Sequence, residues 1–156
     1  MLTRRRRVHA PPEAVWAVLA DGWLYPLFVV GASSMRAVDP TWPQVGAALH
    51  HTVGAWPLTL HDTTSVRAVE PLRRLEVVAR GWPAGEAVVV FELEADGAGT
   101  LVTLHEDASS GPGRFVPAPL RHAMLAPRND ETLLRLEHLA RGRAGLGDPP
   151  GTLPGE

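Results

Sequence analysis

The sequence predicts an α+β domain in which a seven-stranded, curved antiparallel sheet wraps around one long C-terminal helix. Apolar residues recur at a helical period from Asp130 onward, whereas polar and apolar residues alternate with a period of two from Ser34 to Glu106. The predicted strands follow one another through short turns, which favours an antiparallel meander. A run of strands closed by one long helix is typical of the α+β class.

The first predicted strand, residues 2–9, contains four consecutive arginines, Arg4–Arg7. These could form a phosphate or nucleic-acid patch. Alternatively, every second arginine faces solvent while the others lay their apolar stems over the rim of the sheet. We favour the second interpretation, because no aromatic residue is interleaved with them and no second basic cluster joins them.

Two short helices are predicted after this strand. The proline pair at residues 11 and 12 suits the first turn of a helix. Its apolar face is formed by Val15, Trp16 and Leu19. The almost wholly apolar stretch 23–30 predicts a second short helix, broken or bent at Pro26.

Six further strands are predicted from the alternation of polar and apolar residues. They cover residues 34–39, 46–54, 58–69, 73–80, 86–95 and 99–107. Asp96-Gly97-Ala98-Gly99 forms a hairpin turn between the last two, which therefore pair antiparallel. Trp-Pro dipeptides at Trp42, Trp56 and Trp82 mark strand ends. Their rings either seal the sheet, which we favour, or surround a cavity mouth.

The closing helix is predicted in two parts. Leu120–Ala126 forms a first segment, and Pro127 predicts a kink or break after it. Asn129 or Asp130 then caps the start of the main segment. We expect one domain over residues 1–143, with a disordered tail over residues 144–156 because that stretch is rich in glycine and proline.

Composition excludes several classes of function. The chain of 156 residues has no cysteine and no lysine, which removes disulfides, thiolate metal sites and Schiff-base chemistry. A net charge of −2 gives no electrostatic reason to expect nucleic acid or an anionic membrane as partner. No apolar run reaches the roughly 20 residues of a membrane span, and no secretory signal follows the arginines. We therefore expect a cytoplasmic protein.

Polar side chains on inward faces of the strands are the candidates for chemistry. By strand parity Glu106 shares a face with Val102 and Leu104, Asp62 with Leu60 and Val66, and His51 with Leu49 and Val53. Two carboxylates and a histidine form a possible acid/base set for enolisation or dehydration. A purely structural role for these residues is the interpretation we favour. The adjacent His50 and His51 point to opposite faces, and no histidine pair has metal-ligand spacing, so we expect neither a metal nor a cofactor.

Five stretches together carry a family resemblance. Val8–Asp21 holds an Ala-Pro, an acidic residue and a Val-Trp pair, and Gly46–Pro57 holds Leu-His-His and Gly-Ala-Trp-Pro. Gly99–Glu106 is followed by Gly111–Gly113, and Asn129–Leu136 lies in the closing helix. These stretches resemble the helix-grip superfamily, known as START, SRPBCC or polyketide cyclase/dehydrase and lipid-transport proteins. The resemblance implies a helix-grip fold with an apolar cavity between sheet and helix; no catalytic motif of the family matches residue by residue.

We expect this cavity to bind a hydrophobic small molecule that is lipid-like or polyketide-like. The expected ligand-binding residues are Trp23, Phe28, Leu49, Val53, Trp56, Leu60, Val77, Val89, Phe91, Leu104, Met124 and Leu133. One alternative is a cyclase, aromatase or dehydratase that uses Glu106, Asp62 and His51 as catalytic residues. Another is a protein-interaction module that docks a partner or a second copy through the surface around residues 23–30. The protein is expected to be a monomer or a homodimer.

Overall fold

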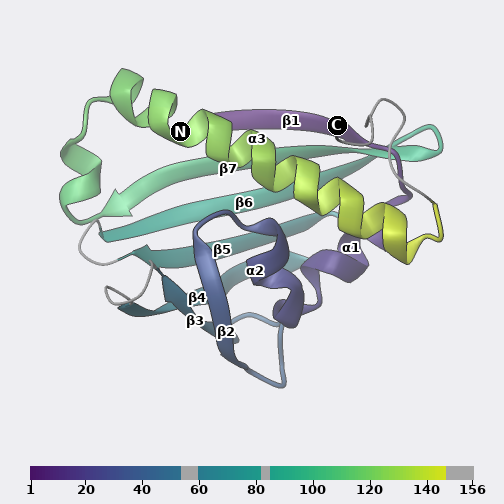
Figure 1. The fold of residues 1–156 in the computed structure, drawn as a ribbon, viewed down its shortest axis with the longest axis horizontal. Coiled ribbons are helices and arrows are strands. Elements are labelled where there is room, and N and C mark those ends of the chain that lie inside the picture. Colours follow the sequence, from purple (N-terminus) through teal and green to yellow (C-terminus); the bar gives the residue numbers. More distant parts are fainter. Residues whose placement is uncertain (54–59, 82–84, 147–156) are drawn as a thin grey trace, which may run out of the picture.

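The computed structural model describes residues 1–53, 60–81 and 85–146. Within these residues, seven antiparallel strands form one sheet that curves around a long helix (Figure 1). The strands are β1 (Leu2–Val8), β2 (Ala32–Val38), β3 (Ala48–Val53), β4 (Leu60–Glu70), β5 (Arg74–Gly81), β6 (Gly85–Asp96) and β7 (Gly99–Ser110). Their spatial order is β1-β7-β6-β5-β4-β3-β2. The predicted α+β helix-grip fold is thus confirmed.

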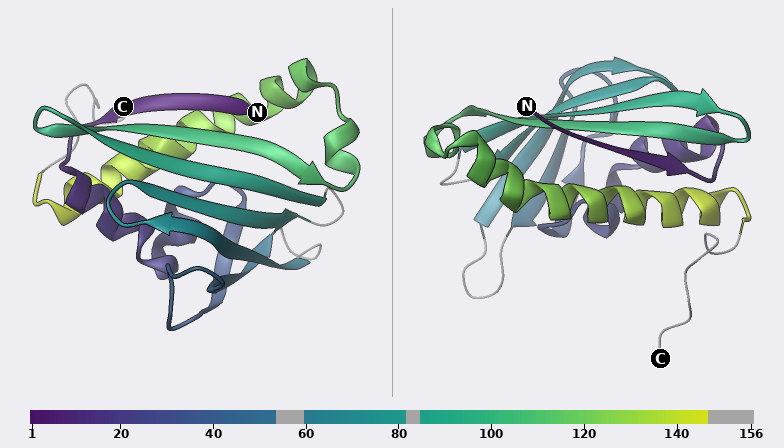
Figure 2. Two further views of the ribbon diagram at one scale, coloured as in Figure 1. Left: turned by 180° about the vertical axis from the view of Figure 1, so that it is seen from behind. Right: turned by 90° about the horizontal axis from the view of Figure 1, so that it is seen from above.

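The helices lie on one face of this sheet, as Figure 2 shows from behind and from above. They are α1 (Pro12–Leu19), η1 (Gly22–Leu24), α2 (Tyr25–Phe28), η2 (Pro112–Phe115) and α3 (Ala118–Arg143). Helix α3 contacts β1, α1 and α2. Each predicted short helix is present, and Pro26 lies in the first turn of α2, where its missing N–H is tolerated.

Helix α3 is one continuous element, so of the predicted kink or break at Pro127 the break is wrong. Pro127 removes a single donor from the helical ladder, and the remaining hydrogen bonds keep both parts in one helix. The predicted caps are also wrong, because no helix starts after Pro127. Asn129 and Asp130 lie inside α3, which begins at Ala118 with Pro119 in its first turn.

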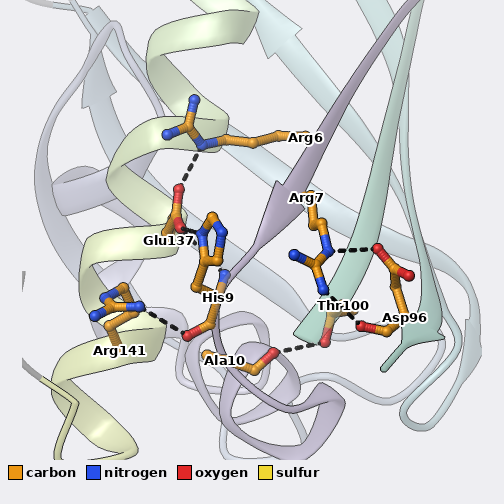
Figure 3. Close-up of polar contacts among 8 residues, drawn as sticks. All are labelled: Arg6, Arg7, His9, Ala10, Asp96, Thr100, Glu137 and Arg141. Atoms are coloured by element: carbon orange, nitrogen blue, oxygen red, sulfur yellow. Dashed lines mark hydrogen bonds and ion pairs between the residues drawn. The ribbon is translucent and has the colours of Figure 1, made fainter. Parts of the chain in front are cut away.

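The arginines of β1 alternate as predicted. Arg5 and Arg7 are exposed on the outer face, whereas Arg4 and Arg6 are half-buried and face α3. Arg4 donates to both carboxylate oxygens of Asp130, at 2.6 and 2.5 Å. Arg6, Arg7 and their neighbours are drawn in Figure 3. Parity alone did not reveal that the inward arginines bind carboxylates of α3.

The core lies between the middle of the sheet and the second half of α3. Leu133 and Leu136 of α3 are buried in one cluster with Phe28 and Phe91, whose rings meet edge to face at 6.3 Å. Trp42 donates its indole N–H to the carbonyl of Leu19 at 3.1 Å, which supports the sealing role. The other two Trp-Pro pairs and residues 147–156 of the predicted tail lie outside the described residues. No helix among the described residues is long and apolar enough to span a membrane.

Candidate functional site

A cavity of about 360 Å³ lies at one end of the space between the sheet and α3. It is bounded by the end of α2, the end of β5, the start of β6, and the segment from η2 into the first half of α3. Its apolar lining residues include Val29, Val30, Ala32, Val116, Met124 and Leu125. A volume of this size lies at the lower end of ligand pockets, which span roughly 300–1,000 Å³.

Three alanines form the floor of this cavity. Ala79 of β5 pairs with Ala87 of β6, and Ala87 pairs with Ala108 of β7, so the three methyl groups lie in one row across three strands. In the core, the corresponding row contains Leu75, Phe91 and Leu104. The cavity therefore exists because the inward side chains become small toward this end of the sheet.

His51 and Tyr25 form one polar wall. The ring of His51 stacks on Tyr25 with centroids 5.9 Å apart, and its Nε2 lies 2.8 Å from Oγ1 of the buried Thr64. Burial lowers the pKa of His51; the charges of Arg36 and His50 act in the same direction, and Asp62 opposes them. At neutral pH His51 is consequently an uncharged imidazole. Its Nδ1 has no hydrogen-bond partner among the described residues.

The hydroxyl of Tyr25 also keeps its proton. Burial raises the pKa of Tyr25, and this effect outweighs the hydrogen bond with Thr64 and the nearby charge of Arg128. The cavity thus offers a neutral phenol and a neutral imidazole next to each other, and both can form hydrogen bonds with an uncharged ligand.

Glu106 and Arg128 form the second polar wall. Arg128 of α3 donates to both carboxylate oxygens of Glu106 on β7, and Asn129 donates its side-chain N–H to Glu106 at 2.8 Å. Glu106 is only 6% exposed, so this cation compensates a carboxylate that burial would otherwise disfavour. The pair ties α3 to the sheet at the inner end of the cavity.

The structure places two of the three candidate catalytic residues in the cavity lining. His51 and Glu106 line the cavity, as strand parity predicted, whereas Asp62 is outside its lining. Asp62 is buried opposite His51 in the β3–β4 register, and its Oδ1 accepts the backbone N–H of Thr63 at 3.2 Å. This local contact is typical of a structural role.

Most of the expected ligand-binding residues lie elsewhere. Met124 lines the cavity, although it is 67% exposed. The residues outside the lining are Trp23, Phe28, Leu49, Leu60, Val77, Val89, Phe91, Leu104 and Leu133. Most of these are core residues, because large side chains fill the middle of the sheet; Trp23 and Leu60 are exposed. The side chain of Val53 and all of Trp56 lie outside the described residues.

Sequence reasoning missed Tyr25, Thr64, Arg128 and the alanine row. Ala79 and Ala87 could have been found by pairing the predicted strands 73–80 and 86–95 antiparallel and looking for small residues in register. Arg128 could not be recognised as a cavity residue, because the predicted break at Pro127 separated it from the first helical segment. No group of three or more metal-ligating side chains lies together within the described ranges.

A curved antiparallel sheet that grips a long helix defines the helix-grip fold. The sequence matches the family described as polyketide cyclase / dehydrase and lipid transport over residues 2–141. The chain belongs to this family. A search of curated proteins found no relative by sequence.

Solved structures share this fold at low sequence identity. StfQ, a di-domain ARO/CYC from the steffimycin biosynthetic pathway, has a TM-score of 0.71 and 9% identity, over 93% of this chain and 51% of that chain. Protein NE0264 from Nitrosomonas europaea has a TM-score of 0.70 and 20% identity, over 90% and 94% of the two chains. Ara h 8.0201 has a TM-score of 0.66 and 14% identity, over 90% and 97%. At these identities the likeness concerns the fold alone.

Proposed function

We propose that this protein binds a hydrophobic small molecule, lipid-like or polyketide-like, in the cavity between the sheet and α3. The observation that carries the proposal is the apolar cavity of about 360 Å³ with its floor of three alanines. Burial of apolar ligand surface against these walls drives binding. Tyr25 and His51 orient the ligand through its polar atoms. The family description supports a ligand of this class.

Native mass spectrometry tests this proposal directly. The protein is purified gently from its own host, and its intact mass is compared with its mass after denaturation. We expect a reproducible non-covalent adduct that denaturation removes and whose mass identifies the ligand. In parallel, the fluorescent dye anilinonaphthalene sulfonate is titrated into apo protein, and competition by the released ligand is measured. Absence of both an adduct and saturable dye binding would contradict the proposal.

Acid/base catalysis in the same cavity is the second candidate function. It is favoured by the neutral His51 beside the protonated Tyr25, since an uncharged imidazole can accept a proton at neutral pH. The reaction class would be the cyclisation or dehydration of a bound polyketide-like molecule. Turnover of the ligand identified by mass spectrometry is compared among wild type, His51→Gln, Glu106→Gln and Asp62→Asn. A loss of turnover in His51→Gln with retained binding supports catalysis, and unchanged turnover in all three variants contradicts it.

A further inference from the structure

An exposed apolar surface borders the cavity over η2 and the first turns of α3. Phe115 is 78% exposed, Leu120 56% and Met124 67%. Large exposed apolar side chains are ordinarily scattered singly over a protein surface, whereas these three lie close together in sequence. The other exposed residues between positions 112 and 127 are prolines, alanines and Arg114. We call the exposed part of residues 112–127 the mouth surface.

The mouth surface carries positive charge without any carboxylate of its own. No acidic residue occurs from Ala108 to Asn129. Arg121 is paired with Asp107, and Arg128 is paired with Glu106. Arg114 lies 5.3 Å from the centre of the Phe115 ring and forms no ion pair with any residue that the structure describes. Among the residues that the structure describes, its charge is therefore uncompensated.

The start of α3 adds to this positive surface. The helix begins beside Phe115 without a side-chain cap, and its first turn contains no acidic residue. Free N–H groups and the positive end of the helix dipole consequently lie on the mouth surface. Apolar side chains, a helix start without a side-chain cap and an arginine with no ion pair among the described residues thus occur on one segment, which also lines the hydrophobic cavity.

We propose that the mouth surface docks on an anionic phospholipid bilayer. Phe115, Leu120 and Met124 enter the boundary between headgroups and acyl chains, while Arg114 and the helix start lie among the phosphates. A symmetric dimer through this surface is disfavoured, because it would place the positive helix start and Arg114 of one copy against those of the other. A protein partner is also disfavoured, since protein interfaces have a hydrogen-bonding polar rim that these prolines and alanines do not supply.

Docking in this orientation places the cavity against the bilayer, because Met124 belongs to both the mouth surface and the cavity lining. A hydrophobic ligand can then move between bilayer and cavity without crossing water. The net charge of −2 gives no indication of this positive surface, because the acidic residues lie elsewhere in the sequence.

Vesicle flotation tests the proposal. The full chain is mixed with vesicles of phosphatidylcholine alone or with added phosphatidylglycerol, and the fraction that floats is measured. We expect binding to the anionic vesicles, weakened by salt. Phe115→Ser and Leu120→Ser should each lower the partition coefficient about tenfold, and Arg114→Glu should lower it at least about fivefold.

Matched controls lie away from the mouth surface. Val45 is 64% exposed in the loop between β2 and β3, and Arg5 is exposed on the outer face of β1. Val45→Ser and Arg5→Glu should leave vesicle binding unchanged. Phe115 and Leu120 are outside the cavity lining, so their variants should still bind the dye when no vesicles are present. This comparison separates failure of docking from failure of ligand binding.

Three outcomes would overturn the docking proposal. One is no flotation with either kind of vesicle. Another is equal loss of binding in the control variants. The third is a dimeric mass by light scattering that becomes monomeric in Phe115→Ser, which would show that the mouth surface is a contact between two copies.

Discussion

Glu137 of α3 is a fully buried carboxylate held by neighbours from the start of the chain. Its oxygens accept the Nε–H of Arg6 at 2.6 Å and the backbone N–H of His9 at 3.1 Å, and Oε1 lies 2.7 Å from Nδ1 of His9 (Figure 3). Arg141 also donates to the carbonyl of His9 at 3.1 Å. The cluster thereby fastens the β1–α1 connection to the last turns of α3.

Replacing Glu137 should reveal a pH-dependent part of the stability. Burial alone would raise the pKa of Glu137, but the hydrogen bonds from His9 and Arg6 together lower it below its usual 4.5. The ionised form therefore stabilises the fold fully above pH 4.5, and this contribution is lost as the pH falls through the lowered value. We expect Glu137→Gln to lower the free energy of unfolding by about 3 kcal/mol at neutral pH.

Urea unfolding at neutral and acid pH measures this effect. The difference between wild type and Glu137→Gln should shrink below pH 4.5. Glu131→Gln removes only an exposed pair with Arg135 and should cost less than about 1 kcal/mol at either pH. A difference for Glu137→Gln that stays constant with pH would contradict the stabilising role of the ionised carboxylate.

His51 should remain uncharged to lower pH than an ordinary histidine. Burial lowers its pKa below the usual 6.5, with Arg36 and His50 adding to the shift and Asp62 opposing it. Its ring resonances in an NMR titration should have a midpoint below pH 6.5. The resonances are assigned by their disappearance in His51→Gln. A midpoint above 6.5 would mean that solvent or a carboxylate reaches the ring.

At the scale of the elements, local rules predicted the strands and both helical segments of α3, but not that these segments form one continuous helix. Alternation located the six strands from β2 to β7. Parity also placed His51 and Glu106 inward. The continuity of α3 past Pro127 was missed because propensity treats Pro127 as a break, whereas packing of Leu133 and Leu136 against the core stabilises the whole helix. Because a break was predicted at Pro127, the Glu106–Arg128 pair was not predicted either.

Pro127 should therefore lower the free energy of unfolding, because it removes one hydrogen bond from α3. Replacing it with alanine restores the N–H that can donate to the carbonyl of Ala123, at an exposed position of the helix. We expect Pro127→Ala to raise the free energy of unfolding by about 2 kcal/mol, after the entropy that proline removes from the unfolded chain is deducted. Thermal or urea unfolding measures the change.

Pro119→Ala is the matched control, because Pro119 lies in the first turn of α3, where no helical hydrogen bond is lost. Its effect should be close to zero or slightly destabilising. An unchanged or lower stability in Pro127→Ala would indicate that the proline is needed to direct Arg128 toward Glu106.

The whole molecule shows a gradient of side-chain size along the inner face of the sheet. Leu75, Phe91 and Leu104 fill the middle, and the alanine row leaves the cavity toward the end where β5 meets β6. No single strand reveals this gradient. Strand parity selects which residues point inward, but a cavity depends on the combined volume of side chains from several strands and a helix. This is why core residues such as Phe91 and Leu133 were predicted to contact the ligand.

Filling the alanine row should weaken ligand binding without unfolding the protein. Ala87 lies at the centre of the row, so Ala87→Leu places an isobutyl group where the ligand would lie. We expect the affinity for anilinonaphthalene sulfonate to fall by about tenfold or more, while the free energy of unfolding changes by less than about 1.5 kcal/mol because the new side chain enters existing space. Ala95→Leu adds the same group at an exposed position of the same strand and should leave dye binding unchanged. If Ala87→Leu bound the dye as tightly as wild type, the ligand site would lie outside this cavity, and the polar wall of Tyr25 and His51 would have only a structural role.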